Sequence, residues 1–364
     1  DPICGELCLE AGDVLHVAGL DDPDRAFILP NRLDHDPLSA ISRWRCLRRA
    51  LRQAEEASGW RADFVFFPWL DSYLRFQPSK TLPTMLLGRP WGGLYFRNHH
   101  FGGGDGLLHS VARGDRSLRN RDCRAIGVLD DRFSPAMEEC CGRPVITFPD
   151  ITDETPAAPS TPLVDEIKQR AAGRKIIGMV GLERRKGFLT MLRIAEAVAG
   201  REDWYFVAGG VYCPSTCSEE ERQFAESVER RANETGELDN VFIRFPGGRV
   251  EDGLEFNSLL SAFDVVYAAY EDFQGSSNAL TKAAVFERPV VATKGQCVGN
   301  RVEEFGLGLT IPQGDAAAGE EAIRRILLGI DWGGGRLAPR FAEYHAQHDR
   351  ARLDAVFEQI LATV

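Results

Sequence analysis

The sequence predicts an α/β protein built from two Rossmann-like domains. Short apolar runs rich in β-forming residues alternate with amphipathic helical segments along most of the chain. This alternation is typical of mainly parallel sheets that carry helices on both faces. The chain has 364 residues, which is too long for one ordinary hydrophobic core and fits two such domains.

Composition narrows the class of protein. The chain is 44% hydrophobic and 27% charged, as in soluble globular proteins, and no apolar run reaches the roughly 20 residues that span a bilayer. The formal net charge of −11 argues against a nucleic-acid partner. Nine scattered cysteines indicate reduced thiols and a cytoplasmic location, and Cys213 and Cys217 lack the second ligand pair of a metal site. The sequence starts at Asp1 without a signal-peptide pattern, and what precedes Asp1 is not predicted.

The first domain is expected to cover residues 1–150. Its candidate strands are 13–18, 25–29, 63–69, 93–97, 124–129 and 144–148. After the second of these, the basic segment 42–56 combines an apolar stripe with several arginines. We favour packing of this stripe on the domain's own sheet. The alternative is contact with an anionic acceptor or with a membrane surface, which would make the protein membrane-peripheral.

Two adjacent histidines, His99 and His100, follow the fourth candidate strand. Ligands bind at the carboxyl ends of strands in open α/β sheets, and histidine titrates near neutral pH. His99 and His100 are therefore candidate catalytic acid–base residues, and a surface loop with incidental histidines is the alternative.

Residues 151–162 are rich in Pro, Thr, Ser and Ala and predict a linker to a second domain at 163–335. In this domain the alternation resumes, with candidate strands at 175–180, 204–208, 241–245, 264–270, 289–293 and 307–311. Residues 339–364 predict a closing amphipathic helix.

A basic turn follows the first strand of the second domain. Arg184, Arg185 and Lys186 lie between two glycines, Gly181 and Gly187. Arginine bonds phosphate oxygens in a bidentate manner and lysine adds a compact positive charge. The turn is therefore a candidate diphosphate site, with an exposed basic turn as the alternative.

The loop from Gly275 to Asn278 is a second candidate anion site. Ser277 and Asn278 can cap the following helix, whose first N–H groups and positive dipole end suit a phosphate. Most helix starts of this kind bind nothing, which is the alternative for this loop alone. Because two candidate anion loops occur in one domain, we favour phosphate binding.

The second half of the chain resembles the nucleotide-binding domain of the GT-B glycosyltransferases of family 4 (glycosyltransferase group 1). The resemblance rests on the order and spacing of GLERRKG, PGGRVEDGLEFNSLLSAFDVVYAAY, QGSSNALTKAAVFERPVVAT and GQCVGNRVEEFGLGLTIPQGD. It implies the GT-B fold, in which two Rossmann-like domains face each other across a cleft. It also implies that residues 336–364 form a C-terminal helix that packs back on the first domain.

The resemblance implies roles for individual residues. The basic turn and the start of the later helix would bind the donor diphosphate, and the loop after the third strand would receive the nucleobase. The implied diphosphate residues are Arg184, Arg185, Lys186, Ser277, Asn278 and Ala279, and the implied nucleobase residues are Arg249 and Val250.

The chain departs from the family at a Glu-x7-Glu pair that contacts the donor sugar and the ribose. Gln274 and Lys282 hold these two places here. Gln274 and Gly275 are then expected at the donor sugar. Glu271 and Asp272, just upstream, would also reach the sugar if the loop is rearranged, and Glu271 is a candidate catalytic residue. Lysine cannot accept hydrogen bonds from ribose hydroxyls, so Lys282 is expected near the ribose or the donor phosphates and would pair with a phosphate. The alternative is that its ammonium group reaches solvent from the flank of the helix.

The predicted function is that of a glycosyltransferase, which moves a sugar from a nucleotide-sugar donor to a sugar-containing or small-molecule acceptor. The resemblance implies a retaining reaction with no metal and no cofactor besides the nucleotide-sugar co-substrate. A non-catalytic glycosyltransferase-like binding or partner protein is the alternative, motivated by the missing Glu pair, and a sugar phosphorylase or epimerase is a third possibility. The donor, the acceptor and the oligomeric state are not predicted.

Overall fold

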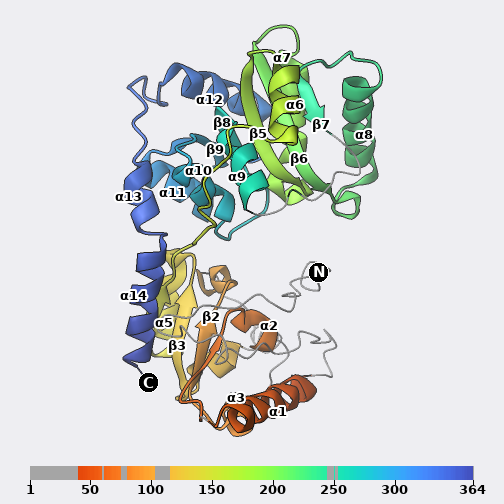
Figure 1. The fold of residues 1–364 in the computed structure, drawn as a ribbon. Helices are drawn as coiled ribbons and strands as arrows, with labels where there is room; N and C mark the ends of the chain where they lie inside the picture. The colour runs from red at the N-terminus through yellow and green to blue at the C-terminus, as the bar shows by residue number, and fades with distance from the viewer. Residues whose placement is uncertain are drawn as a thin grey trace. The chain divides into compact units, whose positions relative to one another are not determined.

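The computed structural model describes residues 40–59, 61–74, 80–102, 115–243, 250 and 253–363. The chain forms two compact units (Figure 1). The first unit combines Asp1–Pro149 with Arg350–Val364, and the second is Asp150–Asp349. The candidate strands 13–18 and 25–29 lie outside the described residues, whereas the other predicted strands are present with shifted ends.

The described residues of the first unit form a four-stranded parallel sheet with the strand order β1-β2-β3-β4. The strands are β1 (Val65–Phe67), β2 (Trp91–Leu94), β3 (Cys123–Val128) and β4 (Val145–Thr147). The helices are α1 (Ala40–Ser58), α2 (Leu70–Leu74), α3 (Leu82–Leu87), α5 (Ser134–Cys141) and α14 (Arg350–Leu361), with short 3-10 helices η4 (Asn98–Gly102), η5 (Asp115–Arg119) and η6 (Asp131–Phe133).

Both faces of this sheet are covered, because successive strand residues point to opposite faces. On one face, Phe67 of β1 packs with Trp44 of α1 and Trp91 of β2. On the other face, the neighbouring Phe66 packs on Phe357 of α14, with a ring-centroid distance of 5.1 Å. The last helix is therefore part of the hydrophobic core of the first unit.

In the second unit, the part of the chain that the structure describes forms a six-stranded parallel sheet with the order β10-β9-β8-β5-β6-β7. The strands are β5 (Lys175–Leu182), β6 (Trp204–Tyr212), β7 (Val241–Ile243), β8 (Val265–Ala268), β9 (Val290–Thr293) and β10 (Gly308–Ile311). The helices are α6 (Pro162–Ala171), α7 (Phe188–Val198), α8 (Glu219–Asn233), α9 (Leu254–Ser261), α10 (Asn278–Val285), α11 (Cys297–Phe305), α12 (Ala316–Leu328) and α13 (Phe341–Ala346), with 3-10 helices η7 (Arg184–Lys186) and η8 (Pro214–Thr216).

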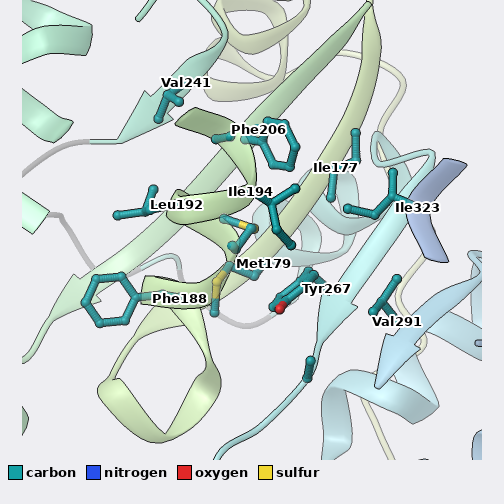
Figure 2. Close-up of a cluster of buried hydrophobic side chains, with 14 of the residues drawn as sticks. Ile177, Met179, Phe188, Leu192, Ile194, Phe206, Val241, Tyr267, Val291 and Ile323 are labelled. Atoms are coloured by element: carbon teal, nitrogen blue, oxygen red, sulfur yellow. The ribbon is translucent and has the colours of Figure 1, made fainter. Parts of the chain in front are cut away.

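Two apolar clusters fill the second unit, one on each face of the sheet. Ile177 of β5 belongs to the cluster drawn in Figure 2, together with Phe188 and Leu192 of α7 and Phe206 of β6. The neighbouring Ile176 belongs to the other cluster, which includes residues of α6, α9, α10 and α11. This is the layered α/β arrangement that the alternation of apolar runs and helices predicts.

The predicted C-terminal helix is two helices. α13 ends before Gln347, and α14 begins at Arg350. Tyr344 of α13 is buried in the second unit, whereas Val356 and Ile360 of α14 are buried in the first. The chain therefore leaves the second unit at Asp349, later than the boundary at residue 336 that the sequence predicts.

Candidate functional site

Two loops of the second unit emerge side by side at the carboxyl edge of its sheet. β5 and β8 are adjacent parallel strands, so the turn after β5 and the loop after β8 leave the same edge. The backbone N–H of Glu271 donates to the carbonyl of Arg185 over 2.8 Å. Gly187 has a positive φ of 77°, and a Cβ at this position would lie 2.2 Å from the carbonyl oxygen of Ala269. A glycine is therefore required for this close approach.

Lys186 lies directly over the end of β5. Its Nζ donates to the carbonyl of Val180 over 3.3 Å, and a Cβ added to Gly181 would lie 2.3 Å from that Nζ. Burial lowers the pKa of Lys186, and nearby Glu183 opposes this shift. The ammonium group is thus held at the strand end, where ligands of open α/β sheets bind.

Arg185 is held by a carboxylate and an aromatic ring. Its Nε donates to Glu183 over 2.7 Å, and its guanidinium lies over the ring of Phe273, 5.1 Å from the ring centre. The side chain remains 42% exposed. Arg185 and Lys186 therefore both belong to the strand edge that the sequence singles out, although their binding of a diphosphate stays a prediction.

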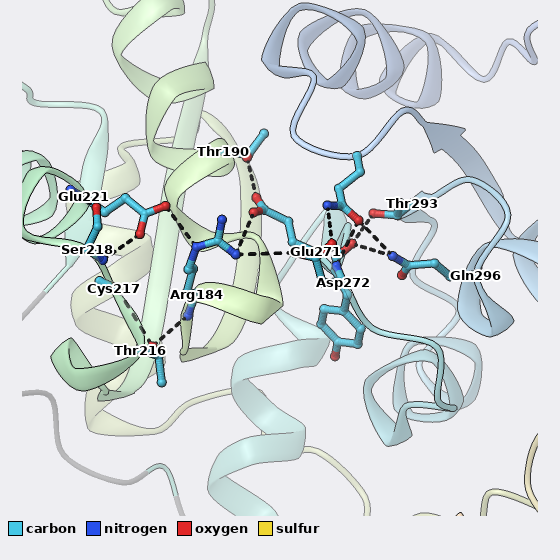
Figure 3. Close-up of polar contacts among 12 residues, drawn as sticks. Arg184, Thr190, Thr216, Cys217, Ser218, Glu221, Glu271, Asp272, Thr293 and Gln296 are labelled. Carbon is cyan, nitrogen blue, oxygen red and sulfur yellow. Dashed lines mark hydrogen bonds and ion pairs between the residues drawn. The ribbon is translucent and has the colours of Figure 1, made fainter. Parts of the chain in front are cut away.

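Arg184 lies in a cluster of carboxylates (Figure 3). Its Nε donates to Glu221 of α8 over 3.0 Å, and its Nη1 lies 3.8 Å from Glu271 and 3.6 Å from Asp272. The hydrogen bond to Glu221 raises the pKa of Arg184 above the usual value of an arginine. These acidic groups already compensate the charge of Arg184, and its binding of a diphosphate stays a prediction.

Two acidic residues of the loop after β8 are fixed by side chains from other elements. Glu271 is buried and accepts a hydrogen bond of 2.8 Å from the hydroxyl of Thr190. Asp272 has a φ of 50°, and its backbone N–H and carboxylate both bond to the side-chain amide of Gln313. Both carboxylates are therefore held in place beside the basic turn.

The backbone at the start of this loop is held as well. The carbonyl of Tyr270 accepts hydrogen bonds from the side chains of Thr293 and Gln296. Sequence reasoning missed the polar partners of this loop, since single polar residues at helix and strand ends carry no distinguishing pattern.

The start of α10 is capped as predicted. The hydroxyl of Ser277 accepts from the N–H of Ala279 over 3.3 Å and also contacts the hydroxyl of Tyr270 at 2.7 Å. In the loop before the helix, Gln274 is exposed and Gly275 is partly buried. The placement of Gln274 and Gly275 at a donor sugar stays a prediction.

Asn278, the first residue of α10, is engaged with the predicted linker. Its side chain accepts from the hydroxyl of Thr152 and donates to the carbonyl of Ile151. The backbone of Asn278 and Ala279 begins the helix, so their expected contact with the donor diphosphate would be made by main-chain N–H groups.

Lys282 is nearly inaccessible, with 2% of its surface exposed. Its Nζ donates to Asn257 over 2.7 Å and to the carbonyl of Asp153 over 3.3 Å, and it lies 4.9 Å from the centre of the Phe256 ring. These contacts point it toward residues of the predicted linker and of α9. The expected pairing of Lys282 with donor phosphates stays a prediction.

The nucleobase residues are described only in part. Arg249 lies outside the described residues, and Val250 is partly buried and packs against the cluster that contains Ile176. Their role at a nucleobase therefore stays a prediction.

In the first unit, the two candidate histidines have different surroundings. Both lie in η4, where His99 is exposed and Nε2 of His100 lies 3.3 Å from Asp115 and 3.4 Å from the hydroxyl of Tyr95. That hydroxyl donates to Asp115 over 2.6 Å. His100 thus has a carboxylate partner that can orient its imidazole. No local pattern in the sequence indicates this partner, because Asp115 belongs to a separate helical turn.

A buried carboxylate fixes the backbone before these histidines. Asp71 of α2 accepts the N–H groups of Phe96 over 2.7 Å and of Arg97 over 3.0 Å. Burial raises the pKa of Asp71 to about 6, against the effect of these hydrogen bonds. Asp71 therefore positions the chain that leads from β2 into η4.

The basic segment 42–56 lies within α1. Trp44 and Leu47 are buried in the core, whereas Arg45, Arg49 and Arg52 are exposed. The favoured interpretation, in which the apolar stripe packs on the domain's own sheet, is confirmed. Among the described residues, no helix has the length and apolar character needed to cross a bilayer.

Comparison with known proteins supports the assignment of the second unit. The sequence model of the family described as "Glycosyl transferases group 1" matches residues 174–328. This range contains the basic turn, the loop after β8 and α10. No curated protein sequence matches the chain.

Several solved structures share the fold across most of the chain. Anabaena Alr3699/HepE in complex with UDP has a TM-score of 0.60 at 13% identity, covering 88% of this chain and 82% of that one. Sucrose-phosphate synthase from Thermosynechococcus elongatus has a TM-score of 0.62 at 17% identity, covering 92% and 83%. A UDP-forming α,α-trehalose-phosphate synthase from Burkholderia xenovorans has a TM-score of 0.59 at 15% identity, covering 90% and 77%.

The fold is that of the GT-B glycosyltransferases, as the sequence predicts. Within the second unit, residues 174–328 form a group 1 glycosyltransferase domain by this match.

Proposed function

We propose that the protein transfers a sugar from a nucleotide-sugar to an acceptor, with the donor diphosphate bound at the carboxyl edge of the second sheet. The observation that carries the proposal is the placement of Lys186 over the end of β5, beside Arg185. Alr3699/HepE, which shares the fold, is known with UDP and with UDP-glucose bound. Uridine diphosphate sugars are therefore the first donors to test.

The proposed reaction is retaining and independent of a metal ion. Lys186 and Arg185 would stabilise the negative charge of the departing diphosphate, and a preorganised cation does this without reorganisation during the reaction. Lys186 meets this requirement because contacts with Val180 and Gly181 already hold its side chain. Glu271 is buried beside the turn and is the candidate carboxylate at the donor sugar.

His100 is the candidate residue on the acceptor side. Its contact with Asp115 would orient the imidazole so that the ring can accept a proton from an acceptor hydroxyl. His99 is exposed, whereas Asp115 and Tyr95 orient the ring of His100, so His100 is the better candidate general base of the two.

A second candidate function is binding without catalysis. It is favoured by Lys282, which stands where the family has a carboxylate and is engaged with Asn257 and Asp153. Turnover separates the two functions, because a binding protein would retain nucleotide affinity without releasing nucleoside diphosphate.

We also propose that the exposed arginines of α1 contact an anionic partner. The reaction itself does not need this contact. Arginines on an amphipathic helix bind anionic lipid headgroups. Co-sedimentation with phosphatidylglycerol vesicles, compared with neutral phosphatidylcholine vesicles, tests this contact. Equal binding to both would remove it from the proposal.

A panel of nucleotide-sugars tests the proposed function. We expect at least one uridine diphosphate sugar to raise the melting temperature, since a ligand that binds only the folded state stabilises it. The same donor should release UDP in the presence of a suitable acceptor, or slowly by hydrolysis in its absence. Stabilisation without any release would favour the binding protein, and no response to any member of the panel would contradict both functions.

A further inference from the structure

The first residues of the second unit lie along the start of α10. Successive residues of this segment form hydrogen bonds with successive positions of the loop and the helix. We call Asp150–Thr155 the crossover segment. The carboxylate of Asp150 accepts a hydrogen bond from the hydroxyl of Ser276. The side chain of Asn278 donates to the carbonyl of Ile151 over 3.0 Å and accepts from the hydroxyl of Thr152 over 2.7 Å. Three successive residues of the segment therefore contact the loop and first turn of one helix.

Two buried side chains continue this contact. Lys282, one turn further along α10, donates to the carbonyl of Asp153 over 3.3 Å and lies 4.0 Å from its carboxylate. Asn257 of α9 is fully buried and donates to Asp153 and, over 2.8 Å, to the carbonyl of Thr155. It also accepts the 2.7 Å hydrogen bond from Lys282. A buried ammonium is costly without such partners, so these bonds hold the segment firmly.

The other end of the segment is fixed by a buried arginine. Arg301 donates to the hydroxyl of Ser276 over 2.5 Å and lies 3.9 Å from the carboxylate of Asp150. The N–H of Asp150 donates to Nδ1 of His348 over 2.9 Å. Asp150 begins the second unit and His348 nearly ends it, so the points where the chain enters and leaves this unit meet at the start of α10.

We propose that Lys282 is a positioning residue, which holds the crossover segment against α10 and thereby couples the position of this segment to donor binding. The inference rests on the proposed function, because the inference requires the donor diphosphate to lie at the start of α10. The side chain of Asn278 holds the segment while its backbone begins the helix that would face the diphosphate. A change in the contact between Asn278 and the crossover segment therefore alters the contact between α10 and the diphosphate. The reverse also holds, because such coupling acts in both directions.

Hydrogen exchange on the wild-type protein tests one direction of the coupling. Saturating UDP should slow amide exchange in a peptide that covers residues 150–156. Unchanged exchange in this peptide, measured while UDP is bound, would overturn the inference.

Two variants test the other direction. Lys282→Met should weaken UDP binding at least tenfold and speed exchange in the same peptide. Thr152→Val keeps the side-chain shape but loses the hydroxyl that bonds to Asn278, so it should fold normally and weaken UDP binding by roughly two- to tenfold, the value of one hydrogen bond.

Lys175→Met is the matched control. Lys175 forms an ion pair of 2.9 Å with Asp264 at the opposite end of β5, so its loss should leave UDP affinity unchanged. If Thr152→Val and Lys282→Met bind UDP as tightly as the wild type, the coupling is absent while the proposed function survives. A wild-type protein that binds no nucleoside diphosphate would overturn both.

Discussion

His348 accepts a hydrogen bond that requires an unprotonated Nδ1. The N–H of Asp150 donates to this atom over 2.9 Å. Burial lowers the pKa of His348 to about 3, and the positive charges of Arg301 and His345 add to the effect. Tyr344 packs on the imidazole, with ring centres 4.3 Å apart. The neutral imidazole therefore stabilises the fold, and its protonation in acid destabilises it.

His348→Asn tests this contribution. The pKa is 6.5 in the unfolded chain and lower in the fold, so the stabilisation is complete above pH 6.5 and is lost as pH falls toward 3. Between pH 7 and 4.5 the wild type should lose about 2–3 kcal/mol more than the variant, because asparagine offers an acceptor that does not titrate. Denaturant unfolding of both proteins at the two pH values measures the difference. Parallel losses would show that His348 titrates normally.

Gly187 joins two structural elements, the 3-10 turn η7 and α7, beside the end of β8. Its φ of 77° and the 2.2 Å that would separate an added Cβ from the carbonyl oxygen of Ala269 both exclude a side chain. Gly200 shares the positive φ, at 67°, but has no heavy atom within 4 Å of such a Cβ. Substitutions at these two glycines therefore distinguish the free-energy cost of the backbone conformation from the cost of a steric clash.

Gly187→Ala should therefore destabilise the protein more than Gly200→Ala. The conformational cost of about 1–2 kcal/mol is common to both. Only at Gly187 must the turn also move away from β8, which should reduce UDP affinity as well. Unfolding and UDP titration of the two variants provide the comparison. Equal stability losses with unchanged affinity would mean that the turn and the β8 loop are not held by this approach.

The helices and strands of the second unit follow from local patterns in the sequence. α7 spans Phe188–Val198, where apolar residues recur at helical spacing. The hydrogen-bond and ion-pair partners of the site residues cannot be predicted from local patterns. Glu271 and Thr190 are 81 residues apart, and Arg184 and Glu221 are 37 apart, so only the folded sheet brings them together. The 3-10 helix at the histidines likewise has its polar partners at distant positions, with Asp71 bonding to the backbone before it and Asp115 lying beside His100.

Each unit of the whole molecule is a parallel sheet with a polar cluster after a strand. His100, Tyr95 and Asp115 follow β2 in the first unit, and Arg185 and Lys186 follow β5 in the second. Resemblance of the sequence to the GT-B glycosyltransferases predicts this two-unit plan, and the shared fold of the solved structures confirms it. The later exit of the chain at Asp349 does not follow from the sequence pattern, because residues 347–349 between α13 and α14 contain neither glycine nor proline to mark the break.

Calorimetric titration of UDP into the wild type, Lys186→Ala and the control Lys175→Ala tests the central claim that the carboxyl edge of β5 binds the donor diphosphate. Removing Lys186 should cost roughly 1.5–3 kcal/mol of binding free energy, the usual worth of a hydrogen bond to a charged group, without altering the melting temperature greatly. Lys175 lies at the opposite end of the same strand, so its variant should bind UDP as the wild type does. Wild-type affinity in Lys186→Ala, or an equal loss in both variants, would contradict the placement of the diphosphate at this edge.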